Sequence, residues 1–139
     1  MIAWSALLAA ALLQASSMPA HPTTIDKGAE SAVDAPRQVT VRTLAEWQTL
    51  WRLHAPGRPV PDVDFERNMV VGVFLGTRPT AGFAVEIVGT RQDHGSLVVQ
   101  YRETRPGRDM MTAQIVTAPY HLATIPRFDG DVRFENLTS

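Results

Sequence analysis

Cysteine is absent from the 139-residue sequence, and lysine occurs only once, at Lys27. Without cysteine the chain has no disulfide, no thiolate metal site and no cysteine nucleophile, so a packed core must supply its stability. Arginine provides the remaining basic residues, and the formal net charge is −1. Because binding to a phosphate backbone requires a basic excess, we expect neither nucleic acid nor an anionic membrane as the main partner.

Charged residues are also absent from residues 1–20, where an unbroken apolar run extends from Ala6 to Leu13. A short apolar run followed by small residues is typical of a secretory signal peptide, and we expect this one to end at Ala20. The run is shorter than the roughly 20 apolar residues that span a bilayer. We therefore expect no membrane span in the mature form and a periplasmic or secreted location. The alternative is an uncleaved leader that anchors the chain in the membrane.

The remainder of the chain divides at residue 38. Residues 21–37 hold Pro, Thr, Ser, Gly, Ala and isolated charges without a sustained apolar period, which predicts a flexible linker. Residues 38–139 have the length and apolar content of one domain with a single core.

One helix is predicted near the start of this domain. Thr43 precedes Glu46 by three residues, the spacing of a capping box, and Pro56 with Gly57 ends the apolar period near residue 55. Four residues form one stripe on this helix: Trp47, Leu50, Trp51 and His54. Helical spacing favours core packing for the two tryptophans over an aromatic platform for a sugar or a peptide.

Strand patterns surround the helix. Val39 and Val41 alternate with polar residues before it, and residues 69–75 after it are almost continuously apolar, which predicts a central strand buried on both faces, with a close backbone approach or a bulge at Gly72. Further alternating patterns cover residues 83–87, 97–101, 111–115, 120–124 and 132–134, and residues 92–95 are a hairpin turn. The sequence predicts a mainly β fold, or α+β with one helix: an antiparallel sheet, small sandwich or barrel on which the N-terminal helix packs.

No convincing set of catalytic or metal-binding residues accompanies these elements. His54, His94 and His121 are far apart in sequence, and their positions favour packing or surface roles. Asp62 and Asp64 resemble the start of a calcium loop, but its remaining ligands do not follow in register. We therefore expect no catalytic residues, no metal and no cofactor.

The most informative segment is the loop at residues 76–83, which follows the central strand. Gly76 and Gly82 tolerate positive φ, and Pro79 fixes its own φ, so we expect a well-ordered loop. A preorganised loop on a rigid sheet is a recognition element, and we expect its partner-binding residues to be Arg78, Pro79, Thr80, Gly82 and Phe83. The alternative is a plain connection whose Gly and Pro only satisfy backbone geometry.

Several of these segments together resemble a known family. Asp64-Phe65, residues 69–76, Arg78-Pro-Thr-Ala-Gly-Phe83 and Thr117-Ala-Pro-Tyr-His121 are similar to the C-terminal domain family of PrcB, a subunit of a bacterial surface protease complex. The similarity covers residues 38–137. It implies a non-enzymatic protein that binds or stabilises an envelope protease or another envelope protein.

The same loop looks like part of a second family. Pro79-Thr-Ala-Gly-Phe83 is similar to the Asn-Pro-Thr-Thr-Gly-aromatic loop of chagasin-type peptidase inhibitors, with Arg78 in place of the Asn and Ala81 in place of the second Thr. The late Arg-Pro-aromatic motif of that family is absent. The leading hypothesis is thus an exported, non-catalytic protein-interaction module, and the alternative is peptidase inhibition through the 76–83 loop.

Overall fold

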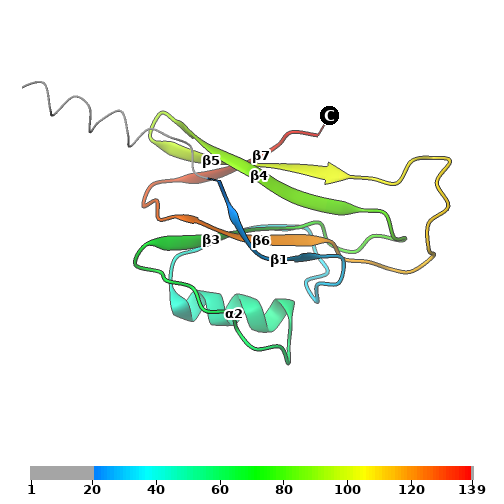
Figure 1. The fold of residues 1–139 in the computed structure, drawn as a ribbon, viewed down its shortest axis with the longest axis horizontal. Helices are drawn as coiled ribbons and strands as arrows, with labels where there is room; N and C mark the ends of the chain where they lie inside the picture. The colour runs from blue at the N-terminus through cyan, green and yellow to red at the C-terminus, as the bar shows by residue number, and fades with distance from the viewer. Residues whose placement is uncertain (1–20, 139) are drawn as a thin grey trace, which may run out of the picture.

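The computed structural model describes residues 21–138, in which seven strands form two sheets that pack face to face, and one helix covers the outside of the first sheet (Figure 1). The first sheet has the order β1 (Thr23–Gly28), β6 (Tyr120–Pro126), β3 (Asn68–Phe74) and β2 (Arg37–Val41), with all neighbours antiparallel. The second has the order β4 (Ala84–Asp93), β5 (Ser96–Thr104) and β7 (Val132–Asn136). The predicted mainly β fold with one helix is confirmed.

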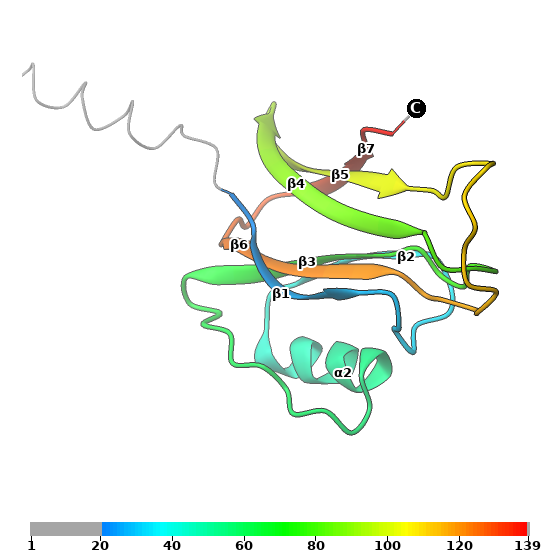
Figure 2. The ribbon, with the colours of Figure 1, turned by 45° about the vertical axis from the view of Figure 1, so that its right-hand side comes forward.

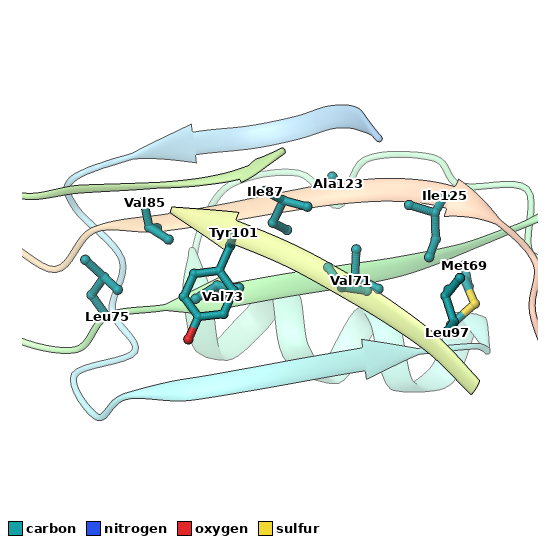
Figure 3. Close-up of a cluster of buried hydrophobic side chains, with 11 residues drawn as sticks. Met69, Val71, Val73, Leu75, Val85, Ile87, Leu97, Tyr101, Ala123 and Ile125 are labelled. Carbon is teal, nitrogen blue, oxygen red and sulfur yellow. The ribbon is translucent and has the colours of Figure 1, made fainter. Parts of the chain in front are cut away.

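The strands β3 and β6 occupy the centre of the first sheet and are buried on both faces. Side chains on the facing surfaces of the two sheets form a core between them (Figure 3), composed of Met69, Val71, Val73, Leu75, Val85, Ile87, Leu97, Val99, Tyr101, Ala123 and Ile125. The alternate residues of β3, such as Val70 and Phe74, point toward the helix instead. Burial on both faces explains why residues 69–75 form a continuous apolar run.

The helix α2 (Leu44–His54) lies against the other face of this sheet (Figure 2). Its first turn is capped as predicted, because the Thr43 hydroxyl accepts the Glu46 N–H at 3.2 Å, and Ala55 is the C-cap. Trp47 and Trp51 are 0% and 1% exposed. Their indole N–H groups donate to the carbonyls of Pro61 and Arg58. The prediction that both rings are core residues is confirmed.

Gly72 allows β3 to pass close to its neighbours. A Cβ at this position would lie 2.5 Å from the Cδ2 atom of Leu122 and 2.9 Å from the Cγ2 atom of Val39. Both distances are shorter than any normal contact, so a side chain at Gly72 would force two packed residues apart. The predicted close approach at this glycine is confirmed.

The second sheet contains one expected feature and one unexpected one. His94 and Gly95 have φ values of 50° and 84° and join β4 to β5 in a tight hairpin, as predicted. β7, however, pairs with β5 in parallel, so the expectation of a purely antiparallel arrangement is wrong for this pair. The alternation of Val132 and Phe134 indicates a strand but carries no information on its direction.

The structure differs from the flexible linker expected over residues 21–37. Residues Thr23–Gly28 form β1, which pairs with β6 along its length, with a register shift between Thr24 and Asp26. β1 is an edge strand with no fully buried side chain: backbone pairing to β6 holds it in the sheet, and its one apolar side chain, Ile25, packs partly buried against the core beneath α2. An element of this kind leaves no hydrophobic period in the sequence.

The expected signal peptide at residues 1–20 lies outside the described residues. Between residues 21 and 138, no helix has the length and the apolar character that a membrane crossing requires.

Candidate functional site

The predicted contact loop, residues 76–83, lies between β3 and β4 at one end of the sandwich. Gly76 and Gly82 adopt φ values of 77° and 96°. A Cβ at Gly76 would lie 2.8 Å from Pro36, and one at Gly82 would lie 2.9 Å from Pro106. Both the backbone conformation and the close packing therefore require glycine at these positions.

The loop is fixed by a second segment, residues 105–117, which follows β5 and lies at the same end of the sandwich (Figures 1 and 2). Arg78 and Thr117 form an antiparallel bridge, with N–H to carbonyl distances of 2.7 and 2.9 Å. The Ala81 N–H donates to the Ala113 carbonyl, and the Thr117 hydroxyl donates to the Thr80 carbonyl at 2.9 Å. We call residues 76–83 and 105–117 together the tip. The hydrogen bonds between the two segments hold both of them in place, so the tip is ordered before any partner binds.

The tip contains a hollow between its two segments. Arg78, Phe83, Arg105 and Pro106 line this hollow, whose volume is about 490 Å³. The guanidinium carbon of Arg78 lies over the Phe83 ring, 5.7 Å from its centroid, at the distance of a cation–π contact. Arg105 is mostly exposed, and its closest carboxylate is that of Glu103 at 3.6 Å. Arg78 forms no ion pair with any carboxylate of residues 21–138.

Exposed apolar side chains are concentrated in the second segment of the tip. Between 55% and 101% of the surface of each of four residues is accessible: Met110, Met111, Ile115 and Val116. The prediction of a strand at residues 111–115 is wrong, because this stretch has no strand conformation; its backbone bonds to the 76–83 loop through the Ala113 carbonyl. The alternation of Met111, Ala113 and Ile115 reflects no buried face. Several exposed apolar side chains close together in one segment are a feature of binding sites.

Comparison with known proteins identifies a family that matches part of the chain. The model of a family described as PrcB C-terminal matches residues 69–126, which run from β3 to the end of β6. The predicted resemblance to the PrcB C-terminal family is confirmed for this segment. No curated protein and no solved structure matches the chain. The PrcB-like segment includes both halves of the tip.

The five predicted contact residues lie together within the PrcB-like segment. Pro79 and Gly82 are exposed, whereas the side chains of Arg78, Thr80 and Phe83 are partly buried against the neighbouring chain. Sequence reasoning missed the contribution of residues 105–117, because no local pattern indicates which end of the sandwich this segment occupies.

A polar cluster outside the PrcB-like segment was also missed. The buried His54 at the end of α2 has two side-chain partners: its Nδ1 atom lies 2.8 Å from the Ser31 hydroxyl, and its Nε2 atom lies 2.9 Å from the Asp26 carboxylate. Burial raises the pKa of Asp26, but hydrogen bonds from His54, Tyr120 and Arg58 outweigh burial and hold that pKa below its ordinary value. Asp26 and Ser31 fall in the stretch expected to be a flexible linker, so no sequence signal joined them to His54.

The cluster has the composition of a hydrolase triad but lacks the surroundings of one. An acyl-transfer site needs free N–H groups near the nucleophile to stabilise the oxyanion. Here the N–H groups of Ser31, Ala32 and Val33 donate to the Ala118 carbonyl, the His54 carbonyl and the Ser31 hydroxyl, respectively. The His54 ring is enclosed by Trp51, Phe74 and Tyr120. This geometry suits a structural tie between β1, the segment after it and α2.

Proposed function

We propose that this chain is an exported, non-catalytic protein-interaction module, PrcB-like, which binds an envelope protein and stabilises it, with a protease as the candidate partner. The observation that supports it is the tip, where four apolar side chains are exposed on segments that hydrogen bonds already hold in place. The PrcB C-terminal match spans the same residues.

The energetics favour a protein surface as the ligand of the tip. Burying an exposed apolar side chain against a partner contributes up to about 1.5 to 3 kcal/mol. Methionine adapts its shape to an irregular surface, and the tip exposes two adjacent methionines, Met110 and Met111. Because the backbone is ordered before binding, association costs less conformational entropy than a free loop would.

We expect the tip to be essential for recovery of the partner from the envelope. The double substitution Met111→Ser and Ile115→Ser should lower recovery of the crosslinked partner at least about 10-fold, because it removes apolar contact area at the tip. The measurement is crosslinking in the native envelope followed by quantitative mass spectrometry. The matched control is Leu44→Ser with Leu53→Ser, which removes two half-exposed apolar side chains from α2.

The control variant and the native protein should recover the same partner in equal amounts. A second tip variant, Arg78→Ala with Thr80→Ala, tests the predicted loop directly. Equal recovery by native protein and both tip variants, with unchanged far-UV circular dichroism, would remove the tip from the binding surface.

The scaffold is expected to perform no acyl transfer through Ser31, His54 and Asp26. Hydrolysis of p-nitrophenyl acetate by the native protein should match that of a Ser31→Ala variant, because the N–H groups beside Ser31 are already engaged. The measurement is the initial rate at pH 7 to 9. A native rate more than about 10-fold above that of Ser31→Ala would indicate a nucleophile and contradict the non-catalytic assignment.

Peptidase inhibition through the 76–83 loop is the alternative function. It is supported by the rigidity of that loop and by its likeness to the chagasin-type loop. Titration of papain with native protein separates the two functions. Complete loss of papain activity near equimolar protein favours inhibition, and an unchanged rate favours the interaction module.

A further inference from the structure

We propose that the hollow in the tip binds a carboxylate of the protein partner, provided by an aspartate or glutamate side chain that has apolar residues beside it. This inference rests on the proposed function, because it names the chemistry of the partner at the same site. It is carried by the charge and the geometry of the residues that line the hollow.

The charge of the tip differs from that of the whole chain. Its two segments contain the three arginines Arg78, Arg105 and Arg108 and a single acidic residue, Asp109, so the tip carries a net charge of +2, whereas the chain carries −1. Two of the arginines line the hollow itself. A local positive charge on a chain that is negative overall favours an acidic group at this place.

The guanidinium of Arg78 is both positioned and available. The bridge to Thr117 fixes the Arg78 backbone, and the Phe83 ring lies beneath the guanidinium. A guanidinium held over a ring keeps the N–H donors at its edge free, and those donors match the two oxygens of a carboxylate. No carboxylate within residues 21–138 pairs with Arg78, so its donors are not already engaged in an ion pair.

The surroundings select a carboxylate on a protein rather than a phosphate backbone. Four exposed apolar side chains lie in the second segment of the tip, and these favour apolar neighbours on the ligand. The chain carries a net charge of −1, whereas binding to a phosphate backbone requires a basic excess. A hollow of about 490 Å³ accommodates an acidic side chain together with part of its neighbour.

The test compares two synthetic peptides that differ only in charge. The peptide acetyl-Leu-Ala-Asp-Ala-Leu-amide should shift the amide resonances of residues 76–83 and 105–108 in the ¹⁵N-labelled protein. The same peptide with Asn in place of Asp should bind about 10-fold more weakly, because it cannot form charge-assisted hydrogen bonds. Raising the NaCl concentration should weaken the binding of the aspartate peptide only.

Variants of the lining residues complete the test. Arg78→Gln and Arg105→Gln each preserve a long polar side chain. Each should lower the affinity for the aspartate peptide about 10-fold and leave the affinity for the asparagine peptide unchanged. The matched control is Arg52→Gln, an exposed arginine on α2, which should change neither affinity. Because the Arg78 side chain is partly buried and the Arg105 side chain is exposed, the second variant keeps the test valid if the first disturbs folding.

Failure of this inference and failure of the proposed function are distinguishable. Equal affinities for the two peptides would overturn carboxylate recognition. So would larger shifts of the same amide resonances with inorganic phosphate than with the aspartate peptide. The proposed function would survive that result if Met111→Ser with Ile115→Ser still abolished partner recovery. If that variant recovered the partner normally, the tip would be removed from the binding surface, and recovery of no partner by the native protein would contradict the proposed function itself.

Discussion

Replacing Trp47 by alanine is expected to lower the free energy of unfolding by about 3 to 5 kcal/mol, the range for deletion of a fully buried tryptophan. Trp47 is 0% exposed between α2 and the first sheet, beside the ring of Trp51. Its indole N–H donates to the Pro61 carbonyl at 2.9 Å. The substitution therefore leaves a cavity and removes the partner of a carbonyl. Urea denaturation followed by far-UV circular dichroism should show a lower midpoint with an unchanged slope.

Two further substitutions separate packing from hydrogen bonding at this position. Trp47→Phe keeps an aromatic ring in the core but loses the hydrogen bond to the Pro61 carbonyl. It should therefore lower the free energy of unfolding clearly less than Trp47→Ala. Leu53→Ala removes a half-exposed side chain from the same helix and should change stability by less than about 0.5 kcal/mol. If Trp47→Ala cost no more than Leu53→Ala, the helix would contribute little to the core.

The elements that could be predicted from the sequence are those with a local signature. α2 begins at a capping box and carries one apolar stripe, and both features depend only on residues three or four positions apart. β3 was predicted because burial on both faces produces an uninterrupted apolar run. The β4–β5 hairpin was predicted because residues 92–95 include His94 and Gly95, which adopt the positive φ of its turn.

The elements that could not be predicted depend on contacts between distant residues. β1 pairs through its backbone with β6, almost 100 residues away, and a side-chain hydrogen bond between Thr24 and His121, 97 positions apart, joins the same two strands. The chain between β5 and β6 alternates like a strand, but it joins neither sheet and pairs with the 76–83 loop instead. The hydrophobic periodicity of a segment does not indicate which other segment it pairs with.

The candidate site shows the same division. The order of the 76–83 loop could be predicted from Gly76, Pro79 and Gly82, whose conformations are restricted locally. The hollow could not, because it requires Arg105 and Pro106 to lie at the same end of the sandwich as Arg78, and strand order decides that. Likewise, Asp26, Ser31 and His54 come together only because β1 joins the sheet that α2 covers.

Acidification from pH 6.5 toward pH 4 is expected to destabilise the fold through His121. This residue of β6 is 3% exposed and bridges the two sheets: its Nδ1 atom accepts the Ile87 N–H of β4 at 2.8 Å, and its Nε2 atom lies 2.8 Å from the Thr24 hydroxyl of β1. Burial, assisted by the positive charge of Lys27 and opposed by Glu86, lowers the pKa of His121 from 6.5 to about 4. The folded ring therefore stays neutral where an unfolded one is protonated.

The direction of the effect follows from proton linkage. Between pH 6.5 and pH 4, His121 is protonated in the unfolded chain but stays neutral in the folded protein. The contribution of His121 to the free energy of unfolding is therefore complete above pH 6.5 and is lost as the pH falls to about 4. The loss is at most about 3 kcal/mol for a pKa difference of this size. Urea denaturation at half-unit steps of pH measures it. A His121→Gln variant should be less stable at pH 7 and should show a shallower decline on acidification, whereas His21→Gln, whose parent side chain is exposed, should follow the native curve. Parallel curves for the native protein and His121→Gln would mean that His121 does not couple protonation to folding.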